Sequence, residues 1–447
     1  MSKGTKRSRR KSKANKSAAT TVVPTEALSG KAALSAAGAS HGHRRISRWA
    51  VGIVVTVAAL NWLTSPLQYG PTRALEHVWH ALAQHGIDVR MSAADAAAAL
   101  AKVHVFTSAC LFLSSRITPV APAASMSAWL GALWSRTTGS SVAEPVLYVR
   151  DRKDALFVVF WGIVLVAIRG VLMDNVLHRI ARRVVQPPAA NHGDAARRAR
   201  RYGLSTSRFT EQAWIAILYL TSLCLVLVSA RAPFPLTSAK TTTIQKPFWP
   251  WHLKLLWVDY PHARMDALTK TVYLWQISNY IHQLITINVE ERRSDYWYMT
   301  VHHVVTIFLI GGSYACCLTN VGLAILLLMD PSDVLLALAK MLKYMGWQTL
   351  CDAMFVAFML TWTITRHVLF LLLMYSCVTE APAIVPFKSP VDFASGYVFT
   401  KTSFGVFLAL LGLLQAILML WYSMIIGVAW RVVTSNGATD SRSDDED

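Results

Sequence analysis

The chain has 447 residues, of which 54% are hydrophobic and only 15% are charged. A soluble domain usually has about 25% charged residues, so this composition, with its long apolar runs, excludes an ordinary soluble domain and predicts a polytopic membrane protein. Much of the net charge of +19 lies in the N-terminal tail and in the loop 181–208. Such clusters flank membrane spans, and because they lack interleaved aromatic and base-reading residues, we expect no nucleic-acid partner.

The N-terminal tail, 1–48, is basic and rich in Ser and Ala, a composition that predicts disorder. Apolar runs of about 18–28 residues follow, each long enough to cross about 30 Å of hydrocarbon. The Ala-rich segment 93–115 carries Asp95, Lys102 and His104, and we expect an amphipathic or luminal helix there rather than a span. The apolar runs predict an all-α fold, a polytopic membrane helix bundle of about eight transmembrane helices, at 49–67, 155–173, 213–230, 270–289, 299–319, 321–342, 351–378 and 403–430.

Basic residues beside the spans predict the orientation of the chain. The basic tail is expected in the cytoplasm, and the C-terminus and the basic loop after the second span then fall on the same side. The chain is divided accordingly into a cytoplasmic tail 1–48, the first span with a luminal segment 49–147, the second span with a basic cytoplasmic loop 148–206, a catalytic helix bundle 207–434 and an acidic cytoplasmic tail 435–447.

The acidic tail has Ser443 directly before Asp444, Asp445 and Glu446, and Ser441 two residues earlier. An acidophilic kinase of the casein-kinase-2 type prefers acids at these positions, and a phosphate would add a charge of about −1.5 to −2. Two interpretations stay open here: a solvated chain end, or a phosphorylated segment with Ser443 and Ser441 as the modified residues.

Four titratable residues lie deep in two consecutive apolar runs. His302 and His303 are near the start of the fifth run, and Asp330 and Asp333 are in the middle of the sixth. Each such group costs about 2.5–3.5 kcal/mol at bilayer depth, so we predict a catalytic site where the two antiparallel helices meet. The alternative is a buried polar network that only packs the helices together.

A carboxylate beside an imidazole fixes its tautomer and raises its basicity. The imidazole can then take a proton from an attacking amine or alcohol, or accept an acyl group itself. Because adjacent helical residues point about 100° apart, we expect one histidine to react and the other to orient or bind.

A metal-dependent lipid hydroxylase is a further alternative, but it would need several histidine clusters. The remaining histidines of this chain are scattered, and its six cysteines form no C-x-x-C pair. We therefore predict no metal site, and we expect the cysteines to be small buried apolar side chains.

The stretch 288–347 reads NVEERRSDYWYMTVHHVVTIFLIGGSYACCLTNVGLAILLLMDPSDVLLALAKMLKYMGW. It combines an arginine pair, an aromatic residue, the double histidine and a D-x-x-D motif before L-A-L-A-K. In this order it resembles the signature of the ceramide synthases of the TLC-domain family, in particular their fungal-type members. Flanking segments extend the resemblance over about 148–431.

The resemblance implies a ceramide synthase, which transfers a fatty acyl group from acyl-CoA to the amino group of a sphingoid base, dihydrosphingosine or phytosphingosine, to give (dihydro)ceramide. It implies a multi-pass protein of the endoplasmic reticulum membrane, with acyl-CoA as co-substrate and no bound cofactor. Membrane lipid, a homo- or heterodimer with a paralogue and a small regulatory subunit are the partners it suggests. The alternative is a non-catalytic TLC-domain protein, translocon-associated or lipid-sensing, and such relatives generally lack the paired histidine with D-x-x-D.

The resemblance also suggests roles for charged residues. Arg366, mid-span in the seventh run, is expected to pair with Asp330 or Asp333. Because Pro331 leaves Asp330 more adjustable, we expect Asp330 to contact the substrate amine or a second imidazole, and Asp333 to hold an imidazole. The CoA head is polyanionic, so four basic residues are expected at a cytoplasmic mouth, although the positive-inside rule alone also explains them: Arg292, Arg293, Lys340 and Lys343.

Overall fold

The computed structural model describes residues 46–62, 93–115, 147–187, 195–231, 233–234, 244–245, 253–258, 260–290, 294–387 and 397–434. These ranges are almost wholly helical, as predicted, because long apolar runs can satisfy their backbone groups inside a membrane only within helices. Their strands are two-residue antiparallel pairs, β1 (Leu147–Tyr148) with β4 (Met265–Asp266) and β2 (Pro233–Phe234) with β3 (Ile244–Gln245).

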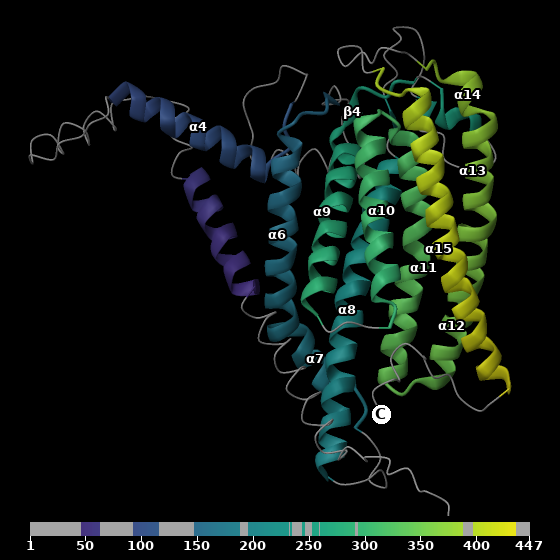
Figure 1. Cartoon of the computed structure of the whole chain (residues 1–447). Coiled ribbons are helices and arrows are strands. Elements are labelled where there is room, and N and C mark those ends of the chain that lie inside the picture. Colours follow the sequence, from purple (N-terminus) through teal and green to yellow (C-terminus); the bar gives the residue numbers. More distant parts are fainter. Residues whose placement is uncertain are drawn as a thin grey trace, which may run out of the picture.

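The long helices run side by side as one bundle (Figure 1). Within it α11 packs against α8 and α12, α9 against α6 and α10, and α10 against α15. The bundle helices are α6 (Asp154–Leu172), α8 (Ala195–Arg231), α9 (Ala267–Val289), α10 (Tyr296–Ala315), α11 (Thr319–Tyr344), α12 (Gln348–Trp362), α13 (Phe370–Thr379) and α15 (Lys401–Thr434). Shorter pieces are η1 (Met173–Leu177), α7 (His178–Val184), η2 (Leu253–Leu256), η3 (Thr363–Leu369) and α14 (Ala381–Ile384).

A helix occupies each of the predicted spans, but not all of these helices are long and apolar enough to cross a membrane by themselves. Five meet that condition among the described residues: Asp154–Val184, Ala195–Ala230, Thr319–Tyr344, Gln348–Ile384 and Lys401–Val432. The first predicted span is a shorter apolar helix, Ile46–Trp62. Helix α9 carries many polar residues, most of them buried in the bundle, and neither α9 nor α10 meets the condition, so the total of eight spans stays a prediction.

The segment 93–115 contains α4 (Ala93–Leu111), which does not run along the bundle. Figure 1 shows it at an angle, near the end of the bundle that carries β4 and α14. It is not among the five described helices that are long and apolar enough to span a membrane, and its place relative to the membrane stays a prediction. Most of the cysteines are buried, as expected, but Cys224 is exposed and Cys316 is partly so.

The bundle has two ends, the basic end and the β1–β4 end. The basic end holds the start of α10 and the last turn of α11, where Lys343 lies, and α7, whose last turn carries Arg182 and Arg183. The opposite, β1–β4 end holds the turn between α10 and α11. The predicted spans 299–319 and 321–342 leave only Asn320 between them, but the turn lies at residues 316–318, where Cys317 adopts a positive φ of 59°.

At the β1–β4 end a buried lysine ties three segments together. Lys270, 0% exposed, forms an ion pair with Asp154 at 2.9 Å and donates to the carbonyls of Ser114 and Val149 at 2.8 Å each. Asp154 also accepts a hydrogen bond from the Tyr314 hydroxyl at 2.7 Å. The sequence placed Lys270 only at the edge of a span, because its partners come from distant parts of the chain.

Candidate active site

The two histidines lie on the second turn of α10 and point in different directions. Their rings are perpendicular, with centroids 5.5 Å apart. His302 lines a cavity between α10, α11 and α15, whereas His303 is 1% exposed and lies behind it. This is the arrangement that the 100° separation of adjacent helical residues predicts.

His303 is held from two sides. Its Nδ1 lies 2.6 Å from the carbonyl of Met299, and its Nε2 lies 3.2 Å from Oε1 of Gln283, which also accepts from the Tyr219 hydroxyl. Two acceptors satisfy both N–H groups of a protonated ring, and turning the Gln283 amide by 180° would offer an N–H to the neutral ring. Both ring nitrogens of His303 can therefore be hydrogen-bonded in the neutral ring and in the protonated one.

Among the described residues, aromatic rings hold the His302 side chain. Trp421 of α15 packs against it edge-on with centroids 5.1 Å apart, and Tyr280 of α9 lies at 6.4 Å. Its Nδ1 has no hydrogen-bond partner in the part of the chain that the structure describes. Because its ring lines the cavity, His302 is the histidine that a substrate there can reach.

Asp333 and Arg366 form an ion pair beside this histidine. Nη2 of Arg366 donates to Asp333 at 2.8 Å and to the carbonyl of Met329 at 2.7 Å, and the guanidinium lies 3.8 Å from the centroid of the Trp362 ring. Arg366 is in η3, a π-helical turn, and π-turns occur often at functional sites. The predicted pairing of Arg366 with one of the two aspartates is confirmed.

The contacts of Asp330 and Asp333 differ from those we expected for the two carboxylates. Asp333, expected to hold an imidazole, binds Arg366 and lines the cavity together with His302. Asp330 is 0% exposed, does not line the cavity and accepts a hydrogen bond from Gln276 at 3.1 Å. Three residues on a helix turn through about 300°, so the two side chains diverge by about 60° and only one of them reaches the cavity.

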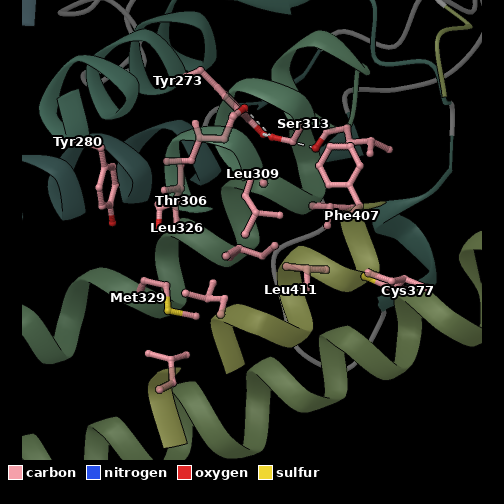
Figure 2. A pocket seen from close by; sticks show the side chains of 18 of the residues that line it. Tyr273, Tyr280, Thr306, Leu309, Ser313, Leu326, Met329, Cys377, Phe407 and Leu411 are labelled. Atoms are coloured by element: carbon pink, nitrogen blue, oxygen red, sulfur yellow. Dashed lines mark hydrogen bonds between the residues drawn. The ribbon is translucent and has the colours of Figure 1, made fainter. Parts of the chain in front are cut away.

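The cavity runs from these polar groups along the axis of the bundle. Figure 2 shows side chains of its wall, among them Leu309, Met329 and Leu411, gathered from α10, α11 and α15. Its far part is bounded by aromatic residues near the β1–β4 end. Phe407 is one of them and packs on Gly312, ten residues beyond His302 on α10, which is about 15 Å of helix. A polar site therefore continues into an apolar channel that is long enough for much of a fatty acyl chain.

The residues predicted for a basic mouth are only partly described. Lys340 lies on α11 seven residues beyond Asp333, which puts both on the same face, two turns apart. Lys343 is exposed at the basic end. Arg292, Arg293, Ser441 and Ser443 lie outside the described residues.

No group of three or more His, Cys, Asp or Glu residues that could hold a metal ion is found within the described ranges. Residues that support the histidines and were not predicted are Met299, Tyr219, Tyr280 and Trp421. The sequence did carry a signal for Gln283, which contacts His303, because Gln276, Asn279 and Gln283 recur at helical spacing in an otherwise apolar run.

A membrane helix bundle that holds paired histidines opposite an Asp-x-x-Asp motif is a site of the TLC-domain type, and the TLC-domain family model matches residues 208–427. Sphingosine N-acyltransferase lag1 of Schizosaccharomyces pombe is 36% identical over 299 residues, which cover 67% of this chain and 69% of the relative. The sphingosine N-acyltransferase-like protein ALT7 of Alternaria alternata is 32% identical over 67% of this chain and 69% of its own. Ceramide Synthase FUM18 of Gibberella moniliformis is 35% identical over 54% and 58%. The chain therefore belongs to the sphingosine N-acyltransferase family of TLC-domain proteins.

Proposed function

We propose that this protein is a ceramide synthase, which transfers a fatty acyl group from acyl-CoA to the amino group of a sphingoid base. The observation that carries this proposal is the available imidazole of His302 beside the Asp333–Arg366 pair, at the polar end of a long apolar cavity. Two long-chain substrates need a site inside the bilayer, and this cavity offers one. Relatives named for the same activity support the assignment.

The side chains around the cavity suggest how the reaction proceeds. His302 acts either as the base that deprotonates the amine or as the transient acceptor of the acyl group. Asp333 attracts the ammonium form of the sphingoid base to the cavity, because a carboxylate in a low-dielectric site favours a cation. Arg366 orients Asp333, and Asp330 supports the network behind the cavity rather than touching the substrate.

The orientation in the membrane and the partners belong to the same proposal. The basic end faces the cytoplasm of an endoplasmic reticulum membrane, and both chain ends lie on that side. Lys340, Lys343, Arg292 and Arg293 bind the phosphates of CoA there, since a polyanionic head requires a basic mouth. Assembly as a dimer with a paralogue and a small regulatory subunit is proposed from the family alone, as is the division of the chain into five segments.

The test uses the full chain, purified in detergent and supplied with acyl-CoA and dihydrosphingosine, with mass spectrometry of the product. The wild type should form dihydroceramide, and His302→Ala and His303→Ala should each lower turnover by about 10²-fold or more, the range of acid–base contributions. His104→Ala in α4, away from the cavity, is the matched control and should be fully active. A folded wild type that forms no amide would reject the proposal and leave a non-catalytic TLC-domain protein.

A further inference from the structure

A line of amides runs along α9 behind the two histidines. Gln276, Asn279 and Gln283 follow one another at three- and four-residue spacing and so share one face of the helix. At one end of the line Gln276 donates to Asp330, and at the other end Gln283 lies 3.2 Å from the His303 ring. The line connects the buried carboxylate of α11 with the buried imidazole of α10.

The line is interrupted in its middle. Asn279 is 0% exposed, yet neither its Nδ2 nor its Oδ1 has a hydrogen-bond partner in the described part of the chain. On either side of it, Oδ1 of Asp330 and Nε2 of Gln283 also have none there. Two donors and two acceptors in or beside this line are thus buried without a partner among the described residues, and each such group costs about 1–3 kcal/mol if it stays unsatisfied.

We infer that Asn279 binds internal water molecules that join His303 to Asp330, and that this water chain carries the proton that amine acylation releases. Along the helix axis Asn279 is about 4.5 Å from Gln276 and about 6 Å from Gln283, gaps that one or two waters bridge with ordinary hydrogen bonds. Buried waters typically make about three bonds to groups of this kind. The substrate itself does not reach these waters, because the residues of α9 that line the cavity are Tyr273 and Tyr280.

The proton balance of the reaction gives such a chain a use, so the inference rests on the proposed N-acylation. The C–S bond of the thioester breaks and a C–N bond forms, while the ammonium loses two protons. One proton ends on the CoA thiol, and the other must leave a site that is surrounded by apolar residues. His302, whose ring lines the cavity, takes it from the amine, and His303 behind it and the water chain pass it on to Asp330 until the products leave and bulk water enters.

The experiment compares Asn279→Leu with Asn279→Ser and with a control, Ser278→Ala. Ser278 is the residue before Asn279 on α9, and its hydroxyl donates to the Leu274 carbonyl of the same helix at 2.7 Å. Turnover, KM and the solvent deuterium isotope effect are measured on the full chain in detergent. We expect Asn279→Leu to lose at least about tenfold in turnover with unchanged KM and a larger isotope effect. Asn279→Ser should retain most of the activity because it keeps a partner for water.

If Asn279 has only a structural role, the opposite result is expected. Replacing an unsatisfied buried amide by an apolar side chain of similar size should then raise stability and leave turnover and isotope effect unchanged. That outcome would overturn the inference while leaving the proposed function intact, whereas an inactive wild type would reject the function itself. If Asn279→Leu fails to fold, a wild-type density map at water-resolving resolution decides, and a map without density beside Asn279 overturns the inference.

Discussion

Replacing Lys270 by Met should be among the most destabilising single changes in the bundle. The substitution keeps a chain of similar length but removes the cation that Asp154 meets at 2.9 Å, in a pair whose side chains are 0% and 4% exposed. Removing one partner of a buried ion pair costs about 3–5 kcal/mol, because the other charge stays buried without compensation. The carbonyls of Ser114 and Val149 also lose their donor, which adds about 1 kcal/mol or more for each.

The expected total, about 5 kcal/mol or more, is comparable with the whole stability of many proteins, about 5–15 kcal/mol. Lys270→Met/Asp154→Asn should recover about 2–3 kcal/mol, since the amide keeps the hydrogen bonds of Asp154 without its charge. Equilibrium unfolding in mixed detergent micelles, followed by circular dichroism, measures both values. Lys153→Met is the control, because Lys153 is exposed beside Asp154 and its loss should change stability by less than about 0.5 kcal/mol.

Two results would refute this reasoning. A Lys270→Met protein that unfolds within about 1 kcal/mol of the wild type would show that the pair is not effectively buried. A double variant no more stable than Lys270→Met would show that the charge of Asp154 is not the source of the loss.

Three further predictions concern the cavity and the tail. Arg366→Lys should lower turnover by about tenfold or more, because one ammonium cannot reproduce the contacts to Asp333, Met329 and the Trp362 ring together. Steady-state kinetics that show unchanged kcat and unchanged KM would contradict this prediction. Phe407→Ala should open the far end of the cavity and shift preference towards longer acyl-CoA, by up to about fourfold for each methylene that becomes buried, as competition between acyl-CoA lengths will measure. Ser443 should be phosphorylated in the native cell, and phosphopeptide mass spectrometry that finds it always unmodified would remove this prediction.

The parts of the fold that rest on hydrophobic runs could be predicted from the sequence. Helices α10 and α11 begin and end within a few residues of the predicted runs, and the pairing of Arg366 with an aspartate followed from the cost of leaving either charge alone in a membrane. The double histidine was likewise visible, because adjacent titratable residues stand out in an apolar segment.

Other features depend on contacts between distant segments and could not be predicted in this way. Asp330 and Asp333 differ by only about 60° in their direction around α11. The pattern of apolar residues does not fix the direction of a side chain that closely, so it could not predict which of the two binds Arg366. The role of Lys270 requires a loop and a helix from more than a hundred residues earlier. Likewise, hydropathy alone cannot separate α9, whose polar residues the bundle covers, from a helix outside the membrane.

The π-turn η3 has a consequence for changes in chain length. Trp362 and Phe370 are both buried although they lie eight residues apart, whereas seven residues make about two full turns of an α-helix. The π-turn thus takes up one residue more than a regular α-helix would, so that the buried sides of α12 and α13 face the same way. Deleting one residue within it would restore a regular helix and leave the packing of both flanks in place. The protein would still fold, but Arg366 and His367, which now face α11 and α15 from consecutive positions, could no longer both reach their partners. Among relatives, a one-residue gap here would therefore mark an altered site rather than an altered fold.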